Sequence, residues 1–422
     1  MSQDMSIVTY SNARHRARRF LCLLSAASLA FASLAAGAGE LERRQAKRIH
    51  DRIAGVPPDN ATLDRMEAEL VANRPENAVA IAMAHPAFYN VTLKNYVAPW
   101  TNEEQSVFVP LNDYTATVIG IIRDDIDFRE ILSGDIIYVG ANSLGLPAYS
   151  NSNNDHYAAL EAQAVDMSDP ANLVRRAQSQ ITGLPAEATA GVLTSRAAAR
   201  AFFVDGTNRA MFNFTLLNHL CLDMNAIKDS SRPSDRIRRD VTRSPGGDSR
   251  IYMNACLGCH AGMDPMAQAY AYYEWEYGGD ADSGRLDYNA TPELNPDTGE
   301  TTRVQPKYHI NQNNFKWGYH TPDDRWSNYW RRGPNAARFG WGNCPGTLDQ
   351  NGVCHGQGAK SLGEELANSE AFASCQVEQV YKAVCFRPPG NAELAAAVAE
   401  FRNSGYRLKT VFASAAIACM GD

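Results

Sequence analysis

The chain has 422 residues, of which 45% are hydrophobic and 21% are charged, and its formal net charge is −7. This length predicts two or three domains, and the composition excludes a largely disordered chain. The acidic balance argues against nucleic-acid binding, because an acidic surface repels phosphates.

The first 38 residues have the pattern of a secretory signal peptide. Four arginines form a positive segment: Arg14, Arg16, Arg18 and Arg19. An apolar run of small residues follows, and it ends in "AGA" at residues 36–38. This order predicts export and cleavage near Ala38. An uncleaved N-terminal anchor is the alternative, although the run is barely long enough to span a bilayer.

Cleavage would leave an acidic chain with eight cysteines. The removed segment carries four Arg, one Asp and Cys22, so the net charge would change from −7 to −10. In an oxidising compartment an even number of cysteines should be paired or bound to a ligand. No later segment is apolar enough to be transmembrane. We therefore expect a periplasmic or extracellular protein without a transmembrane segment in its mature chain.

Residues 39–227 are predicted to form an N-terminal helical domain, because apolar residues recur there at helical spacing. The residues placed to begin helices are Asp59 or Asn60, Asp113, Ser195 and Asn208. Residues 135–141, "DIIYVGA", are the best strand candidate, and their isolation argues against a large sheet. The predicted fold class is therefore mainly α.

Two further segments complete the predicted organisation. Residues 228–358 open with a polar loop and carry the cysteine motif described next. Within them, residues 278–343 are rich in Gly, Pro, Asn and Asp, so we expect this stretch to be mostly irregular. Residues 359–422 are predicted to form a C-terminal helical domain, in which Gly405 stands where a helix should stop. The whole chain is thus predicted to be multi-helical with long irregular loops.

The segment "CLGCH" at residues 256–260 has the attachment pattern of c-type haem. Cys256 and Cys259 lie one helical turn apart, so both thiols can reach the vinyl groups on one porphyrin edge. His260 follows directly and can give an imidazole nitrogen to the iron as proximal ligand. The predicted export supports this interpretation, because haem c is attached outside the cytoplasm. We expect the aromatic run at 270–277 to be core packing or a haem wall.

Three other interpretations of Cys256 and Cys259 are weaker. A thioredoxin-like redox motif follows a strand in a βαβ unit, but here a polar loop comes first. A zinc site would need a second CxxC or a histidine pair at suitable spacing, and none follows. A plain structural disulfide is the simplest alternative.

The distal iron ligand is left open by the sequence. Met263 and Met266 are too close to the motif to wrap over the ring, and Met420 lies near the end of the sequence. Downstream histidines are better placed: His309, His320 and His355. An open or water-bound distal site is the other possibility.

Residues 344–355 carry a stretched version of the motif, C-x9-C-H, which could hold a second haem on Cys344, Cys354 and His355. The favoured alternative is a Cys344–Cys354 disulfide that closes a turn-rich loop. Cys375 and Cys385 are ten residues apart on a predicted helix, or roughly 15 Å, which is too far for a disulfide. They are expected to pair with other cysteines, such as Cys354, Cys221 or Cys419.

Parts of the chain resemble the large planctomycete-type cytochrome c proteins, an exported multi-domain family. The matching elements before and after the motif are Gly191–Thr194, Arg209, Leu220–Cys221 and Asp264–Pro265. Residues 362–418 are similar to the closing helical domain of that family. The resemblance implies a mostly helical fold, one covalent haem and export, but no particular reaction. The chain departs from the family pattern directly after the motif and in the insertion at 278–355.

Together these observations predict an exported c-type cytochrome with one haem c. We expect it to transfer electrons to and from redox partner proteins rather than to catalyse a reaction. The first alternative is a peroxidase- or oxidase-like haem enzyme with an open distal site. The second is a binding or assembly protein whose haem is structural.

Overall fold

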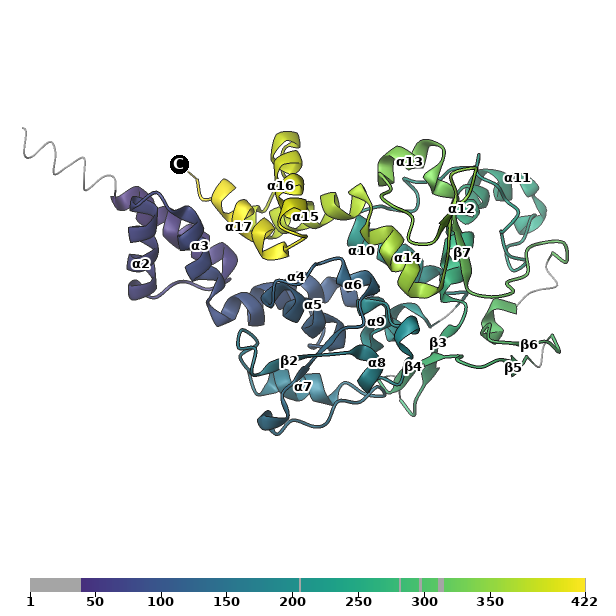
Figure 1. Cartoon of the computed structure of the whole chain (residues 1–422), viewed down its shortest axis with the longest axis horizontal. Coiled ribbons are helices and arrows are strands. Elements are labelled where there is room, and N and C mark those ends of the chain that lie inside the picture. The colour runs from purple at the N-terminus through teal and green to yellow at the C-terminus, as the bar shows by residue number, and fades with distance from the viewer. Residues whose placement is uncertain (1–38, 205, 281, 296–297, 310–314, 422) are drawn as a thin grey trace, which may run out of the picture.

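The computed structural model describes residues 39–204, 206–280, 282–295, 298–309 and 315–421 (Figure 1). The predicted signal peptide at 1–38 therefore lies outside the described residues. Helices dominate the described chain, which confirms the predicted mainly α fold class. The described strands are short and form antiparallel sheets of two or three strands.

Side chains cap two of the N-terminal helices, α2 and α5. Residues 39–53 are helical, and the next helices are α2 (Asn60–Val71), α3 (Pro75–Met83), α4 (Lys94–Val97) and α5 (Asp113–Arg123). The Asp59 carboxylate accepts a hydrogen bond from the Thr62 N–H, as predicted for a cap at this position. Helix α5 begins one residue earlier than predicted, because Asn112 is its cap.

A two-stranded sheet packs against α5. Strand β1 (Ile137–Gly140) confirms the predicted strand and pairs antiparallel with β2 (Leu173–Arg176). The helices of this region are α6 (Glu130–Ser133), α7 (Asp155–Ala162), α8 (Gln178–Ile181), α9 (Arg196–Phe202) and α10 (Arg209–Leu220). The Ser195 hydroxyl caps α9 and Asn208 directly precedes α10, as predicted.

Three consecutive helical segments lead into and carry the motif, which spans the last two of them. They are α11 (Ser249–Ile251), the π-helical turn η7 (Tyr252–Cys256) and α12 (Leu257–Ala267). Helix α12 packs against α10 and against strand β7 (Arg325–Asn328), near one end of the molecule (Figure 1).

Most strands lie after the motif. Strands β3 (Tyr273–Tyr277) and β4 (Gly284–Tyr288) form a hairpin, and β5 (Glu293–Leu294) pairs with β6 (Thr301–Thr302). The third sheet has the order β7–β9–β8, with β8 at Thr347–Leu348 and β9 at Cys354–Gln357.

The expectation of a mostly irregular stretch at 278–343 is therefore only partly right. It contains β4 to β7 and helix α13 (Pro334–Phe339), since these short strands form through pairing rather than local periodicity. The preceding aromatic run contributes to core packing, because Tyr270, Tyr273 and Trp275 are buried.

Four C-terminal helices confirm the prediction for the end of the chain: α14 (Gly358–Ala367), α15 (Glu370–Cys385), α16 (Asn391–Asn403) and α17 (Leu408–Ala418). Gly405 has a φ of 76° between α16 and α17, so it is the predicted helix stop. Helix α15 packs against α10 and α17, and α17 packs against α3, so the C-terminal helices return to the N-terminal region (Figure 1).

One hydrophobic core draws residues from all three predicted segments. It includes Ile49, Met266, Trp330 and Phe412, each fully buried. A smaller cluster surrounds the motif and consists of Ile237, Val241, Tyr252, Leu257 and Ala261, with Cys256 packed against it. The division into domains stays a prediction.

Within the described chain, disulfides join Cys221 to Cys375, Cys344 to Cys354 and Cys385 to Cys419. The Cys344–Cys354 disulfide is the alternative favoured by the sequence for residues 344–355. Cys375 and Cys385 each pair with another cysteine, as expected. Such pairing is compatible with an extracytoplasmic location, because disulfides persist in oxidising compartments. None of the described helices has the length and apolar character needed to cross a membrane.

Candidate functional site

Cys256 and Cys259 are the free cysteines of the described residues. Cys256 ends the π-helical turn η7 and Cys259 lies in the first turn of α12, so one helical turn separates them. Both side chains are half-buried, and the Cys259 sulfur lies 3.7 Å from the Met224 carbonyl oxygen. A π-helical turn directly before the motif is itself notable, because such turns occur often at functional sites.

Two glycines let neighbouring segments approach the motif closely. A methyl group on Gly258 would lie 3.2 Å from Cβ of Lys228, and one on Gly262 would lie 2.0 Å from a ring carbon of Trp330. The Gly258 carbonyl also accepts a hydrogen bond from the Asp229 N–H. The loop after α10 and the aromatic core therefore hold α12 from two sides.

His260 is held by a carboxylate on its own helix. Its Nδ1 lies 3.0 Å from Oδ1 of Asp264, four residues further along α12. The Asp264 side chain is fully buried, whereas that of His260 retains 19% exposure. An ionised Asp264 can only accept hydrogen bonds, so in the neutral imidazole this contact places the hydrogen on Nδ1 and leaves the Nε2 lone pair for a ligand.

Two arginines compensate the buried charge of Asp264. Arg209, the first residue of α10, donates to both Asp264 oxygens at 2.8 and 3.0 Å and to Asp240 at 2.6 and 3.0 Å. Arg238 lies 3.6 Å from Asp264 through Nη2, and its backbone N–H donates to the same carboxylate. These two arginines balance the charges of the two aspartates.

The titration of these groups follows from that balance. Burial alone would raise the pKa of Asp264, but attraction to Arg209 and Arg238 outweighs it and holds this pKa well below its usual range. Burial raises the pKa of the Cys259 thiol.

The surroundings of the motif fit a covalently held porphyrin. The two thiols are free and lie one helical turn apart, and the imidazole follows directly in sequence. Ile251 and Met253, which precede Cys256, are 46% and 54% exposed and add apolar surface next to the motif. The free thiols and the contact of His260 with Asp264 are the observations that favour the fit.

The two distal candidates lie against each other. The ring centroids of His309 and His320 are 4.5 Å apart, and Nε2 of His320 lies 3.5 Å from a Glu300 carboxylate oxygen. His309 is buried, and His320 is partly exposed. The structure thus brings the two histidines together, and a distal role for either one stays a prediction.

The stretched motif is not available for haem attachment as the structure has it. Cys344 and Cys354 are bonded to each other, and both ring nitrogens of His355 have partners. Its Nδ1 lies 2.8 Å from the Ser327 hydroxyl, and its Nε2 lies 3.3 Å from Asp349. The structure therefore favours the loop disulfide over a second haem on Cys344, Cys354 and His355, because a sulfur in a disulfide is not free to form a thioether.

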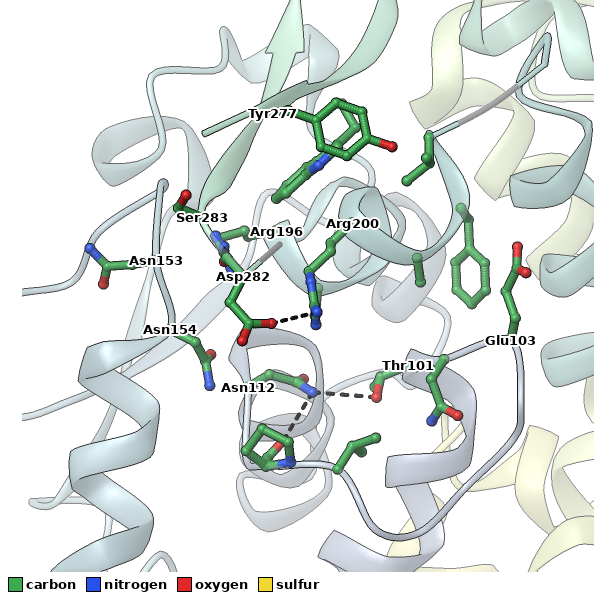
Figure 2. Close-up of a pocket in the computed structure, with 18 of the residues that line it drawn as sticks. Thr101, Glu103, Asn112, Asn153, Asn154, Arg196, Arg200, Tyr277, Asp282 and Ser283 are labelled. Atoms are coloured by element: carbon green, nitrogen blue, oxygen red, sulfur yellow. Dashed lines mark hydrogen bonds and ion pairs between the residues drawn. The ribbon is translucent and has the colours of Figure 1, made fainter. Parts of the chain in front are cut away.

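A hollow of about 870 Å³ lies apart from the motif, between the loop before α5, the start of α7, helix α9 and the β3–β4 hairpin. Polar side chains line it, and Figure 2 shows Arg200 paired with Asp282 and Asn112 bonded to Thr101. None of the sequence-predicted site residues lines this hollow. Among the residues that the structure describes, no three His, Cys, Asp or Glu side chains are grouped to hold a metal ion.

No family model, no curated protein and no solved structure matches this chain. The resemblance to planctomycete-type cytochrome c proteins therefore stays a prediction. Two of its elements nevertheless meet in space, because Arg209 and Asp264 form the bidentate ion pair beside His260. The contributions of Arg238 and Asp240 were missed, since both lie in a polar loop without periodicity.

Proposed function

We propose that the protein is an exported c-type cytochrome that carries one haem c and transfers electrons. The observation that carries this proposal is the state of the motif. Six of the described cysteines are used in disulfides, while the two motif cysteines stay free and one helical turn apart. His260, next in sequence, contacts the buried Asp264 carboxylate through Nδ1, which leaves Nε2 to face a ligand.

The residues have distinct roles in holding the cofactor. Cys256 and Cys259 would hold the haem through two thioether bonds, with each sulfur bonded to one carbon of a vinyl group and the thiol hydrogen transferred to the other carbon. His260 would hold the iron through Nε2. When bound, the haem supplies one-electron redox chemistry. Asp264 holds the His260 ring in place through Nδ1.

The compartment follows from the same chemistry. The disulfides favour an oxidising environment, and haem c attachment requires export, which the predicted signal peptide at 1–38 would provide. We place the mature protein in the periplasm or outside the cell. Redox proteins are its partners in this proposal.

A haem enzyme with an open distal site is the second candidate. The carboxylate on His260 favours it, because a charged acceptor at Nδ1 makes the iron ligand more basic. The contact between His309 and His320 is also compatible with a distal side that neither histidine closes.

Ligand binding and redox cycling separate the two candidates. Purified holoprotein would be titrated with cyanide in the ferric state and with CO in the ferrous state, alongside voltammetry. An electron carrier with a closed six-coordinate haem binds both ligands poorly and shows a reversible one-electron wave. Ready ligand binding with peroxide turnover would overturn electron transfer as the primary function and support the enzyme.

A further inference from the structure

We infer that Asp264 is a positioning residue that sets the reduction potential of the iron bound by His260, and that Arg209 holds Asp264 in the orientation this requires. This inference rests on the proposed function, because it concerns a haem held by His260. It assigns a role to a carboxylate outside the attachment motif.

The position of Asp264 is fixed on every side. It lies one helical turn beyond His260 on α12, so its carboxylate reaches Nδ1 without distorting the helix. Its side chain has no exposure to solvent. Arg209 donates hydrogen bonds to both carboxylate oxygens of Asp264 and also to Asp240, so the Asp264 carboxylate cannot rotate freely.

A fixed carboxylate at Nδ1 changes the electron density at Nε2. The hydrogen bond from Nδ1 to Asp264 gives the imidazole partial anionic character, which makes Nε2 a stronger donor to iron. A stronger donor stabilises ferric iron more than ferrous iron. The nearby negative charge acts in the same direction. Both effects lower the reduction potential relative to a histidine bonded to a neutral acceptor.

The arginines limit the size of this effect. Arg209 and Arg238 compensate the charge of Asp264 and Asp240, so the site as a whole stays close to neutral. The contribution specific to Asp264 is therefore its direct contact with His260. Asp240 offers a matched control, because it is a second carboxylate that pairs with Arg209.

The test compares Asp264→Asn with Asp240→Asn in the full-length holoprotein. Haem content is measured by the pyridine haemochrome method, and the midpoint potential by spectroelectrochemical titration. Both variants should keep one haem per chain. Asp264→Asn should raise the midpoint potential by about 59 mV or more. For a one-electron couple, this shift corresponds to a roughly tenfold higher ferrous-to-ferric ratio at a fixed potential. Asp240→Asn should give a clearly smaller shift.

The outcomes separate the inference from the proposed function. Equal potentials for Asp264→Asn and Asp240→Asn, with haem retained, would overturn the role of Asp264 and leave the cytochrome intact. Absence of covalent haem from the wild-type chain would overturn the proposed function itself. If Asp264→Asn does not fold, Asp264→Glu replaces it, because it keeps the charge but moves the oxygen relative to Nδ1. A potential shift larger than that of Asp240→Asn supports the inference, and an unchanged potential overturns it.

Discussion

Nδ1 of His260 lies 3.0 Å from Oδ1 of Asp264, four residues further along the same helix. This contact links the CxxCH motif to an ion-pair network that begins on α10 and continues into the polar loop before the motif. Tertiary contacts therefore fix the position of the motif segment.

Substitution of Gly262 should loosen that segment. A methyl group at this position would lie 2.0 Å from the buried ring of Trp330, and neither the helix nor the ring can move without cost. Gly262→Ala should lower the free energy of unfolding by about 1–3 kcal/mol, measured by urea denaturation.

The matched control for that experiment is Gly279→Ala. A methyl group on Gly279 meets no atom within 4 Å, so its effect should stay within about 0.5 kcal/mol. Equal stability of the Gly262 and Gly279 variants would contradict the close packing of α12 against Trp330.

The disulfides should differ in their contribution to stability. Cys344–Cys354 spans 10 residues and Cys221–Cys375 spans 154, so the second removes more conformational entropy from the unfolded chain. In the chain-entropy account, replacing both cysteines by serine should lower the free energy of unfolding by about 3 kcal/mol for Cys344–Cys354. The same replacement should lower it by about 5 kcal/mol for Cys221–Cys375. Loss of haem on removal of the Cys344–Cys354 pair alone would show that this loop has a role in cofactor binding after all.

A buried histidine should make stability depend on pH. Burial lowers the pKa of His219 to about 3, and its Nε2 lies 2.7 Å from the Tyr114 hydroxyl. An unfolded histidine titrates near pH 6.5, so below that pH the unfolded chain binds a proton that the folded chain refuses. This contribution to stability is present in full above about pH 6.5 and declines as the pH falls toward 3.

The measurement compares wild-type protein with His219→Gln by urea denaturation at pH 7 and pH 4.5. At pH 7 the wild-type chain should be more stable than His219→Gln. The difference between their free energies of unfolding should narrow at pH 4.5, because only wild type carries the titrating group. An advantage that stays constant between the two pH values would show that His219 is not buried in its neutral form.

Local signals in the sequence were enough to predict many individual elements. Asp59 and Ser195 cap helices where their spacing indicates, and Gly405 stops one. The Cys344–Cys354 disulfide closes a short loop and could be favoured from proximity alone. These features depend on residues close together in the chain.

Pairings between distant residues were not accessible in the same way. Strand β2 lies in a stretch predicted to be helical, because its pattern becomes a strand only through pairing with β1. Likewise, nothing in the spacing of Arg238 or Asp240 indicates that Arg238 contacts Asp264 or that Asp240 pairs with Arg209. The contact between His260 and Asp264 could have been predicted, because residues four apart on a helix lie on the same face. That prediction needed only the assignment of α12 as a helix.

The most direct test of the central claim is haem stoichiometry. The full-length chain and a Cys256→Ala/Cys259→Ala double variant would be secreted from a host that attaches haem c, then analysed by pyridine haemochrome spectra and intact mass. The account predicts one covalent haem per wild-type chain and none in the double variant. A wild-type chain without covalent haem, or a double variant that retains it, would contradict the account.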